Sequence, residues 1–190
     1  MSLQTIPAPE LQVSHWLNTA SPLTLAGLRG RVVVLHAFQM LCPSCVSHGL
    51  PQASKIRETF PEADVAVIGL HTVFEHHAVM GVEALKAFVH EYRIDFPVGV
   101  DQASAGSDIP RTMQAYSLQG TPSLVLIDRQ GSVRLQHFGR MDDMHLGALI
   151  GQLVMEGAAP SVPGHCDDSV GGVSPGRCDD SGCSPWAAHP

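Results

Sequence analysis

The 190 residues are 44% hydrophobic and 15% charged, as expected of a globular chain with one domain and an appendage. Eleven Lys and Arg against 18 Asp and Glu give a net charge of −7, and the scattered basic residues argue against nucleic acid or an anionic membrane as a partner. No apolar run could span a membrane, and the first ten residues lack the basic flank and apolar stretch of a secretion signal. The sequence therefore predicts a cytoplasmic protein, or a periplasmic one if a leader has been removed.

The regular pattern begins after a lead-in, residues 1–30. Residues 31–38 form a nearly continuous apolar, β-branched run, typical of a strand buried on both faces of a parallel sheet. A helical pattern follows from Cys42 to about Phe60, with a predicted kink at Pro51. The remaining expected elements are strands 65–70 and 96–100, helices 81–92 and 111–116, strands 123–127 and 132–138, and a helix over 142–155. Alternating strands and helices predict an α/β fold, and the short 128–131 turn predicts a final antiparallel hairpin.

A Cys-x-x-Cys motif stands between the first predicted strand and helix, as Cys42-Pro43-Ser44-Cys45. At a helix N-terminus, free backbone N–H groups and the positive end of the helix dipole favour the thiolate of the first cysteine. The spacing predicts a redox-active dithiol in which Cys42 is the nucleophile and Cys45 resolves the mixed disulfide.

Three further segments accompany the dithiol: Leu28-Arg29-Gly30-Arg31 before the first strand, Gly120-Thr121-Pro122-Ser123 before a later strand, and Gly131-Ser132-Val133 in the hairpin. Over about residues 11–155 the chain resembles the thioredoxin-fold redoxins, most closely the TlpA-like members of the thiol-specific antioxidant (AhpC/TSA) superfamily. The resemblance implies a thioredoxin-like α/β fold with a mixed central sheet flanked by helices. It also implies thiol–disulfide oxidoreductase activity on protein thiols and disulfides, without an organic cofactor.

The same resemblance assigns roles around the dithiol. Thr121–Pro122 would be a cis-proline loop, where the Thr121 backbone pairs with an extended substrate and Pro122 shields the sulfurs from metal, while Pro43 and Ser44 face the substrate. The simpler alternative for Pro122 is a proline at the start of a strand, without a functional part.

Some positions depart from the family pattern. Leu41 replaces the usual aromatic residue before the first cysteine, and His48 stands where TlpA-like proteins often carry a proton-handling Glu. His48 is therefore either a proton handler or a solvent-facing helix histidine. Peroxiredoxins place a Pro and a Thr at fixed distances before their reactive cysteine. Neither residue stands at those distances before Cys42 or before Cys45, which argues against a thiol peroxidase.

Other histidines have a simple interpretation. His36, inside the first strand, is expected to be a satisfied core residue. His71, His76 and His77 with Glu75 could be drawn as a metal cluster, but a polar loop at a sheet end is simpler.

From residue 157 to 190 the periodicity stops, and Gly, Pro, Ser and Asp dominate; this tail is separated from the 1–156 domain. It carries Cys166, Cys178 and Cys183, which allow three schemes. In the first, two of these cysteines form a disulfide that staples the tail. In the second, a tail thiol exchanges with Cys42. In the third, the three cysteines bind zinc together with His165 or His189. A zinc- or copper-binding module using these cysteines is thus the alternative to the oxidoreductase.

Overall fold

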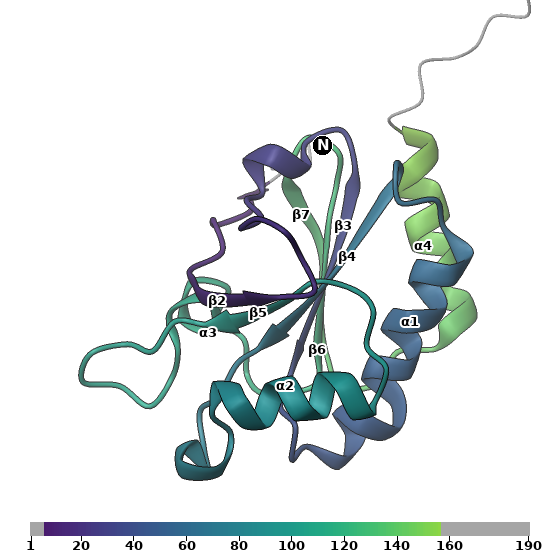
Figure 1. Cartoon of the computed structure of the whole chain (residues 1–190). Coiled ribbons are helices and arrows are strands. Elements are labelled where there is room, and N and C mark those ends of the chain that lie inside the picture. The colour runs from purple at the N-terminus through teal and green to yellow at the C-terminus, as the bar shows by residue number, and fades with distance from the viewer. Residues whose placement is uncertain (1–5, 157–190) are drawn as a thin grey trace, which may run out of the picture. The chain divides into compact units, whose positions relative to one another are not determined.

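The computed structural model describes residues 6–156, and the tail with Cys166, Cys178 and Cys183 lies outside them (Figure 1). Seven strands form one mixed sheet in the order β1-β7-β6-β3-β4-β5-β2. The central strands β3, β4 and β5 are parallel, whereas β6 runs antiparallel to β3, β7 to β6, β1 to β7 and β2 to β5. Their bounds are β1 Ile6–Pro7, β2 Val13–Leu17, β3 Val32–Phe38, β4 Val65–His71, β5 Val98–Asp101, β6 Ser123–Ile127 and β7 Ser132–Phe138.

Helices cover both faces of the sheet, as the mixed α/β prediction requires. The helical bounds are η1 Ala26–Leu28, η2 Cys45–Gly49, α1 Leu50–Thr59, η3 His77–Val79, α2 Val82–Glu91, α3 Arg111–Ala115 and α4 Asp143–Glu156. Buried residues of α1, α2 and α4 pack on one face of the sheet, and those of η1 and α3 pack on the other. Figure 1 shows α1 and α4 side by side on their face. Within residues 6–156, no helix is long and apolar enough to cross a membrane.

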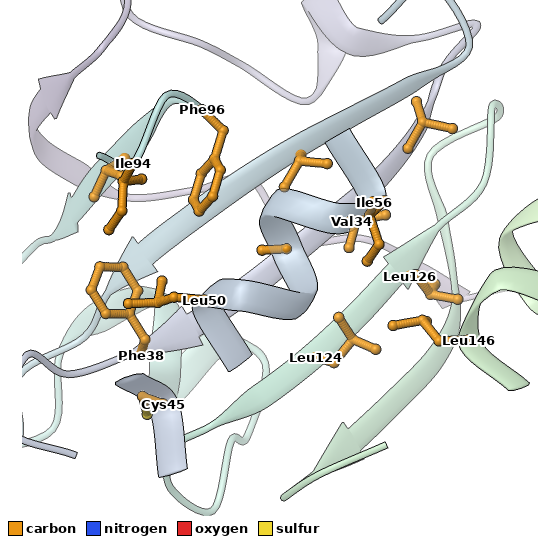
Figure 2. Close-up of a cluster of buried hydrophobic side chains, with 14 of the residues drawn as sticks. Val34, Phe38, Cys45, Leu50, Ile56, Ile94, Phe96, Leu124, Leu126 and Leu146 are labelled. Carbon is orange, nitrogen blue, oxygen red and sulfur yellow. The ribbon is translucent and has the colours of Figure 1, made fainter. Parts of the chain in front are cut away.

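The alternation of side chains along β3 divides the core in two. Val32, Val34 and Phe38 belong to the cluster under α1, α2 and α4, whereas Val33 and Leu35 belong to the cluster on the opposite face. All seven residues of β3 are buried, which confirms the predicted two-sided central strand. Figure 2 shows the first cluster, with Cys45 beside Phe38 at the end of the sheet.

The helix after the dithiol differs from its prediction in one respect. Residues 43 and 44 are helical, η2 is a π-helical turn, and α1 continues from Leu50. Pro51, at the first turn of α1, has no N–H for a bond to the preceding turn, and a π turn is one way in which a helix accommodates that loss. The expected kink at Pro51 is therefore a widened turn that begins at Cys45.

The lead-in also departs from its prediction, because residues 13–17 form β2 rather than an irregular segment. Strand β2 pairs with β5 through Trp16 opposite Gly99 and Leu17 opposite Val98. Gly99 is required there, since a Cβ would lie 2.9 Å from the side chain of Val13.

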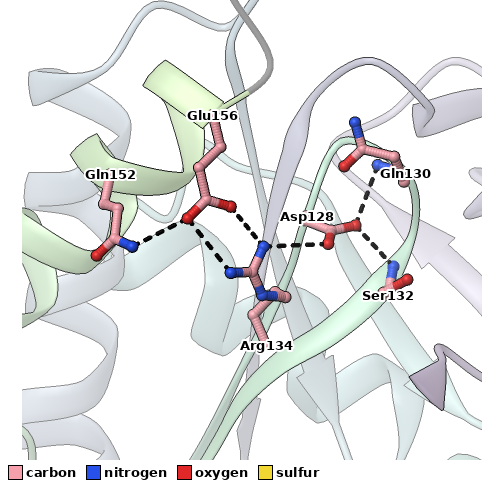
Figure 3. Close-up of polar contacts among 6 residues, drawn as sticks. All are labelled: Asp128, Gln130, Ser132, Arg134, Gln152 and Glu156. Atoms are coloured by element: carbon pink, nitrogen blue, oxygen red, sulfur yellow. Dashed lines mark hydrogen bonds and ion pairs between the residues drawn. The ribbon is translucent and has the colours of Figure 1, made fainter. Parts of the chain in front are cut away.

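A polar network closes the predicted β6–β7 hairpin (Figure 3). Asp128 accepts hydrogen bonds from the backbone N–H groups of Gln130 and Ser132, and Gly131 adopts a φ of +79° that suits glycine. Arg134 then bridges Asp128 and Glu156, which connects the hairpin to the end of α4.

Candidate active site

The predicted dithiol lies at the carboxyl end of β3, where Cys42 and Cys45 form a disulfide. Cys42 is partly exposed and immediately precedes the helical residues, whereas Cys45 is fully buried. The backbone N–H of Cys45 points at Cys42 Sγ over 3.2 Å. This N–H and the helix N-terminus stabilise negative charge on Cys42 once the disulfide opens, so the exposed sulfur is the one suited to nucleophilic attack.

The Thr121–Pro122 loop faces the dithiol, and its peptide bond is cis as predicted. The Thr121 carbonyl oxygen lies 3.6 Å from Cys42 Sγ. Since a disulfide sulfur carries no proton, this is a contact in the oxidised state. Thr121 Oγ1 in turn accepts from Gln39 Nε2 at 3.5 Å, and Gly139 N–H donates to the Pro122 carbonyl at 2.8 Å, which holds the loop between β3 and the end of β7.

A cleft of about 90 Å³ opens beside Pro122 and the π-helical turn. His48 is exposed at this cleft, and its Nδ1 lies 2.7 Å from Ser47 Oγ. Across the cleft, the exposed ion pair between Lys55 and Asp143 joins α1 to the start of α4 at 2.8 Å. The role of His48 as a proton handler stays a prediction, and the sequence analysis did not identify the cleft that it lines.

The interpretation of His36 as a satisfied core residue is wrong in one part. Its side chain is buried, at 2% exposure, but Nδ1 has no hydrogen-bond partner. Burial lowers the pKa of His36 to about 4, so the ring is neutral at neutral pH. The signal was visible in the sequence as a lone histidine within an apolar strand, yet only the structure shows that its partner is missing.

Two apolar side chains that flank the site are exposed. Leu41, at the position before the first cysteine, is 57% exposed, and Phe138, at the end of β7, is 55% exposed. Phe138 lies over Gly120, where a Cβ would stand 3.0 Å from its ring. The sequence analysis named Leu41 but missed Phe138, although the predicted antiparallel hairpin already places residue 138 opposite residue 123, beside the loop of residues 120–122.

The cluster drawn around His71, His76, His77 and Glu75 is not assembled as a metal site. His71 is buried at the end of β4 and stacks on Phe38, with ring centroids 5.4 Å apart, while His76 and His77 are exposed. In the part of the chain that the structure describes, no three His, Cys, Asp or Glu side chains are grouped so that they could hold a metal ion.

Comparison with known proteins identifies the family of the chain. The model of the AhpC/TSA family matches residues 4–136, a span that includes both cysteines and the cis-proline loop. The chain belongs to this family. A search of curated proteins finds no match.

Solved structures of similar proteins agree with this AhpC/TSA assignment. A thioredoxin-like superfamily protein is 59% identical, with a TM-score of 0.79 over 82% of this chain and 99% of that one. A thiol-disulfide isomerase from Corynebacterium glutamicum is 53% identical, with a TM-score of 0.77 over 80% of this chain and 98% of that one. An oxidised thioredoxin-like protein at 22% identity and a TM-score of 0.66, covering 80% of this chain and 97% of that one, shares the fold. The thioredoxin-like fold predicted from the sequence is therefore confirmed.

Proposed function

We propose that this thiol–disulfide oxidoreductase of the AhpC/TSA family exchanges the Cys42–Cys45 disulfide with cysteines of partner proteins. The observation that carries this proposal is the pairing of a partly exposed Cys42 with a buried Cys45 in one disulfide. The isomerase relative at 53% identity supports the same reaction class.

The reaction proceeds through a mixed disulfide. In the reduced protein, the Cys42 thiolate attacks a partner disulfide, and one partner thiolate leaves. Cys45 then loses its proton and attacks Cys42 Sγ, which restores the Cys42–Cys45 disulfide and releases the second partner thiolate. The reverse sequence reduces this protein at the expense of a partner dithiol.

The partner chain docks beside the two sulfurs, on a surface formed by Pro43, Ser44, Thr121 and Pro122. Pro43 is exposed, and the Thr121 backbone lies against Cys42, so an extended segment passing over this loop reaches the nucleophile. The exposed side chains of Leu41 and Phe138 make an apolar flank to this surface. Protein thiols and disulfides in extended, partly apolar segments are therefore the proposed substrates.

His48 is a candidate proton handler at the mouth of the cleft, as predicted from its position in the sequence. Exchange between Cys42 and a tail thiol, and metal binding by Cys166, Cys178 and Cys183, concern residues outside the described range. The cytoplasmic assignment, with the periplasmic alternative, also stays a prediction, and fractionation of cells that express the native gene distinguishes the two.

The experiment is a redox titration of the purified protein in glutathione buffers, read by mass-shift alkylation. Wild type should show a reversible two-electron couple that links Cys42 and Cys45. Cys42→Ser should lose both this couple and turnover of a disulfide substrate, whereas Cys45→Ser should accumulate the mixed disulfide on Cys42. If no 42–45 disulfide forms at any ratio of oxidised to reduced glutathione, the exchange mechanism is wrong.

A further inference from the structure

His36 is a buried titratable group that the exchange reaction, as described, does not use. It lies in the middle of β3, the strand that leads to the dithiol, and pairs with Leu124 of β6. Its unpartnered Nδ1 requires an explanation, because a buried polar atom without a partner costs stability. A neutral imidazole keeps one nitrogen lone pair free and can accept a proton there.

The ring lies on the same side of the sheet as Cys45. Side chains alternate along a strand, and the neighbours of His36 on its face, Val34 and Phe38, pack in the same buried cluster as Cys45. The ring also abuts the helical turn that begins at Cys45. A Cβ placed on Gly49 would be 2.3 Å from His36 Cε1 and 2.7 Å from Nε2. Residues 45 and 49 are the two buried residues of that turn.

The ring has a route to solvent as well. His36 lines the cleft together with Pro122, Gly49 and the exposed His48. A volume of about 90 Å³ is enough for water, which needs polar partners of the kind that an imidazole nitrogen provides. A proton that reaches His36 can therefore leave through the cleft.

We propose that His36 is the proton acceptor for Cys45 in the resolving step, and that it returns the proton to solvent through the cleft. The proposal rests on the proposed thiol–disulfide exchange. As Cys45 Sγ attacks Cys42 Sγ of the mixed disulfide, the Cys45 proton passes to His36. The Cys42–S–partner bond breaks, and the partner leaves as a thiolate. The imidazolium then loses its proton to the cleft water, so the site ends with a neutral histidine and a closed disulfide.

The surroundings of His36 suit this temporary protonation. With the disulfide closed, the ring stays neutral because burial disfavours its charge. A thiolate forming on Cys45 in the same desolvated layer favours the imidazolium. The other titratable groups near the ring line the cleft: His48 of η2, Lys55 of α1, and Arg140 and Asp143 at the start of α4. Lys55 and Asp143 pair with each other, and His48 is exposed.

The test is a single-turnover reaction of the reduced protein with glutathione disulfide, quenched by acid and read by mass spectrometry. The method separates formation of the mixed disulfide on Cys42 from its resolution by Cys45. In wild type, the resolution rate should be nearly independent of pH between 6 and 8, because neutral His36 is available throughout. In His36→Leu and His36→Gln, neither of which has a base, it should rise about tenfold per pH unit. At pH 6 it should be about 10²-fold slower than in wild type. The rate of mixed-disulfide formation should be unchanged.

His71→Leu is the matched control, since His71 is a second buried histidine on the same face that does not line the cleft. It should keep the flat wild-type profile. A tenfold rise per pH unit already present in wild type, or a flat profile in His36→Gln, would overturn the proposal. If His36→Leu does not fold, the wild-type profile and the Gln variant decide. Absence of any mixed disulfide would instead contradict the exchange reaction itself.

Discussion

Gly49 has no side chain, and the ring of His36 fills the space that a side chain there would need. The imidazole lies where a Cβ of residue 49 would be, and the surrounding turn is π-helical rather than α-helical. Glycine normally weakens a helix by about 1 kcal/mol relative to alanine. Here its lack of a side chain is what admits the ring between β3 and the helix that carries Cys45.

Gly49→Ala should therefore destabilise the protein by about 2–3 kcal/mol, because a Cβ at residue 49 would overlap the buried His36 ring and force it out of its present position. Urea unfolding measures the change. Gly147→Ala is the control, since a Cβ on this α4 residue meets nothing within 4 Å. It should be neutral or stabilising by up to about 1 kcal/mol. Equal effects of the two substitutions would contradict the steric argument.

Asp101 connects β5 to α3 and to the segment after β4. At the end of β5, its carboxylate accepts hydrogen bonds from the backbone N–H groups of Thr112 at 2.8 Å and Met113 at 2.9 Å. It also accepts from the hydroxyl of Thr72, which follows β4, at 3.0 Å. Burial raises the pKa of Asp101, and these donors act against that rise. The short helix α3 is thus held at its first turn by a side chain of the sheet.

Asp101→Ala should cost about 2–3 kcal/mol of unfolding free energy, because it leaves the buried N–H groups of Thr112 and Met113 without an acceptor. The free energy is read from chemical denaturation at pH 7. Asp108→Ala removes a carboxylate that is 92% exposed and should change stability by less than about 0.5 kcal/mol. A loss at position 101 no larger than the one at 108 would show that α3 does not depend on this carboxylate.

The whole domain should lose stability in mild acid, because it buries two neutral histidines. Burial lowers the pKa of both His36 and His71 from 6.5 to about 4. Below pH 6.5 the unfolded chain binds protons that the folded chain does not. The stabilisation from each neutral ring is therefore complete above pH 6.5 and falls as the pH approaches 4. Each histidine contributes up to about 3 kcal/mol to this change.

Urea midpoints measured from pH 7.5 to pH 4.5 should fall steadily below pH 6.5 in wild type. His36→Gln removes one of the two buried imidazoles and should reduce the slope by about half. The raised pKa of Asp101 acts in the opposite direction, since its folded form takes up a proton more readily as the pH falls. A wild-type midpoint that is constant over this range would contradict the burial of neutral histidines.

Local patterns were sufficient for most of the fold and for the reacting groups. The continuous apolar runs at β3 and β4 mark buried parallel strands, since only central strands require apolar residues on both faces. The dithiol was recognisable from residue type and spacing, whereas the Thr121–Pro122 loop was expected from the resemblance to a known family. The short β1 and the strand β2 were not predicted as strands, because they depend on partners far along the chain, β7 and β5.

What the sequence by itself determined was the α/β architecture and the Cys42–Cys45 dithiol after a strand, which depend on residues near one another in the chain, whereas the thioredoxin-like fold and the Thr121–Pro122 loop were expected from the family resemblance. Tertiary structure alone decided that Nδ1 of His36 has no partner and that the ring fills the space left by Gly49. The physical reason is that these features are distances between atoms on different elements. Such distances are fixed only when the helix packs on the sheet and the register of β6 and β7 is set.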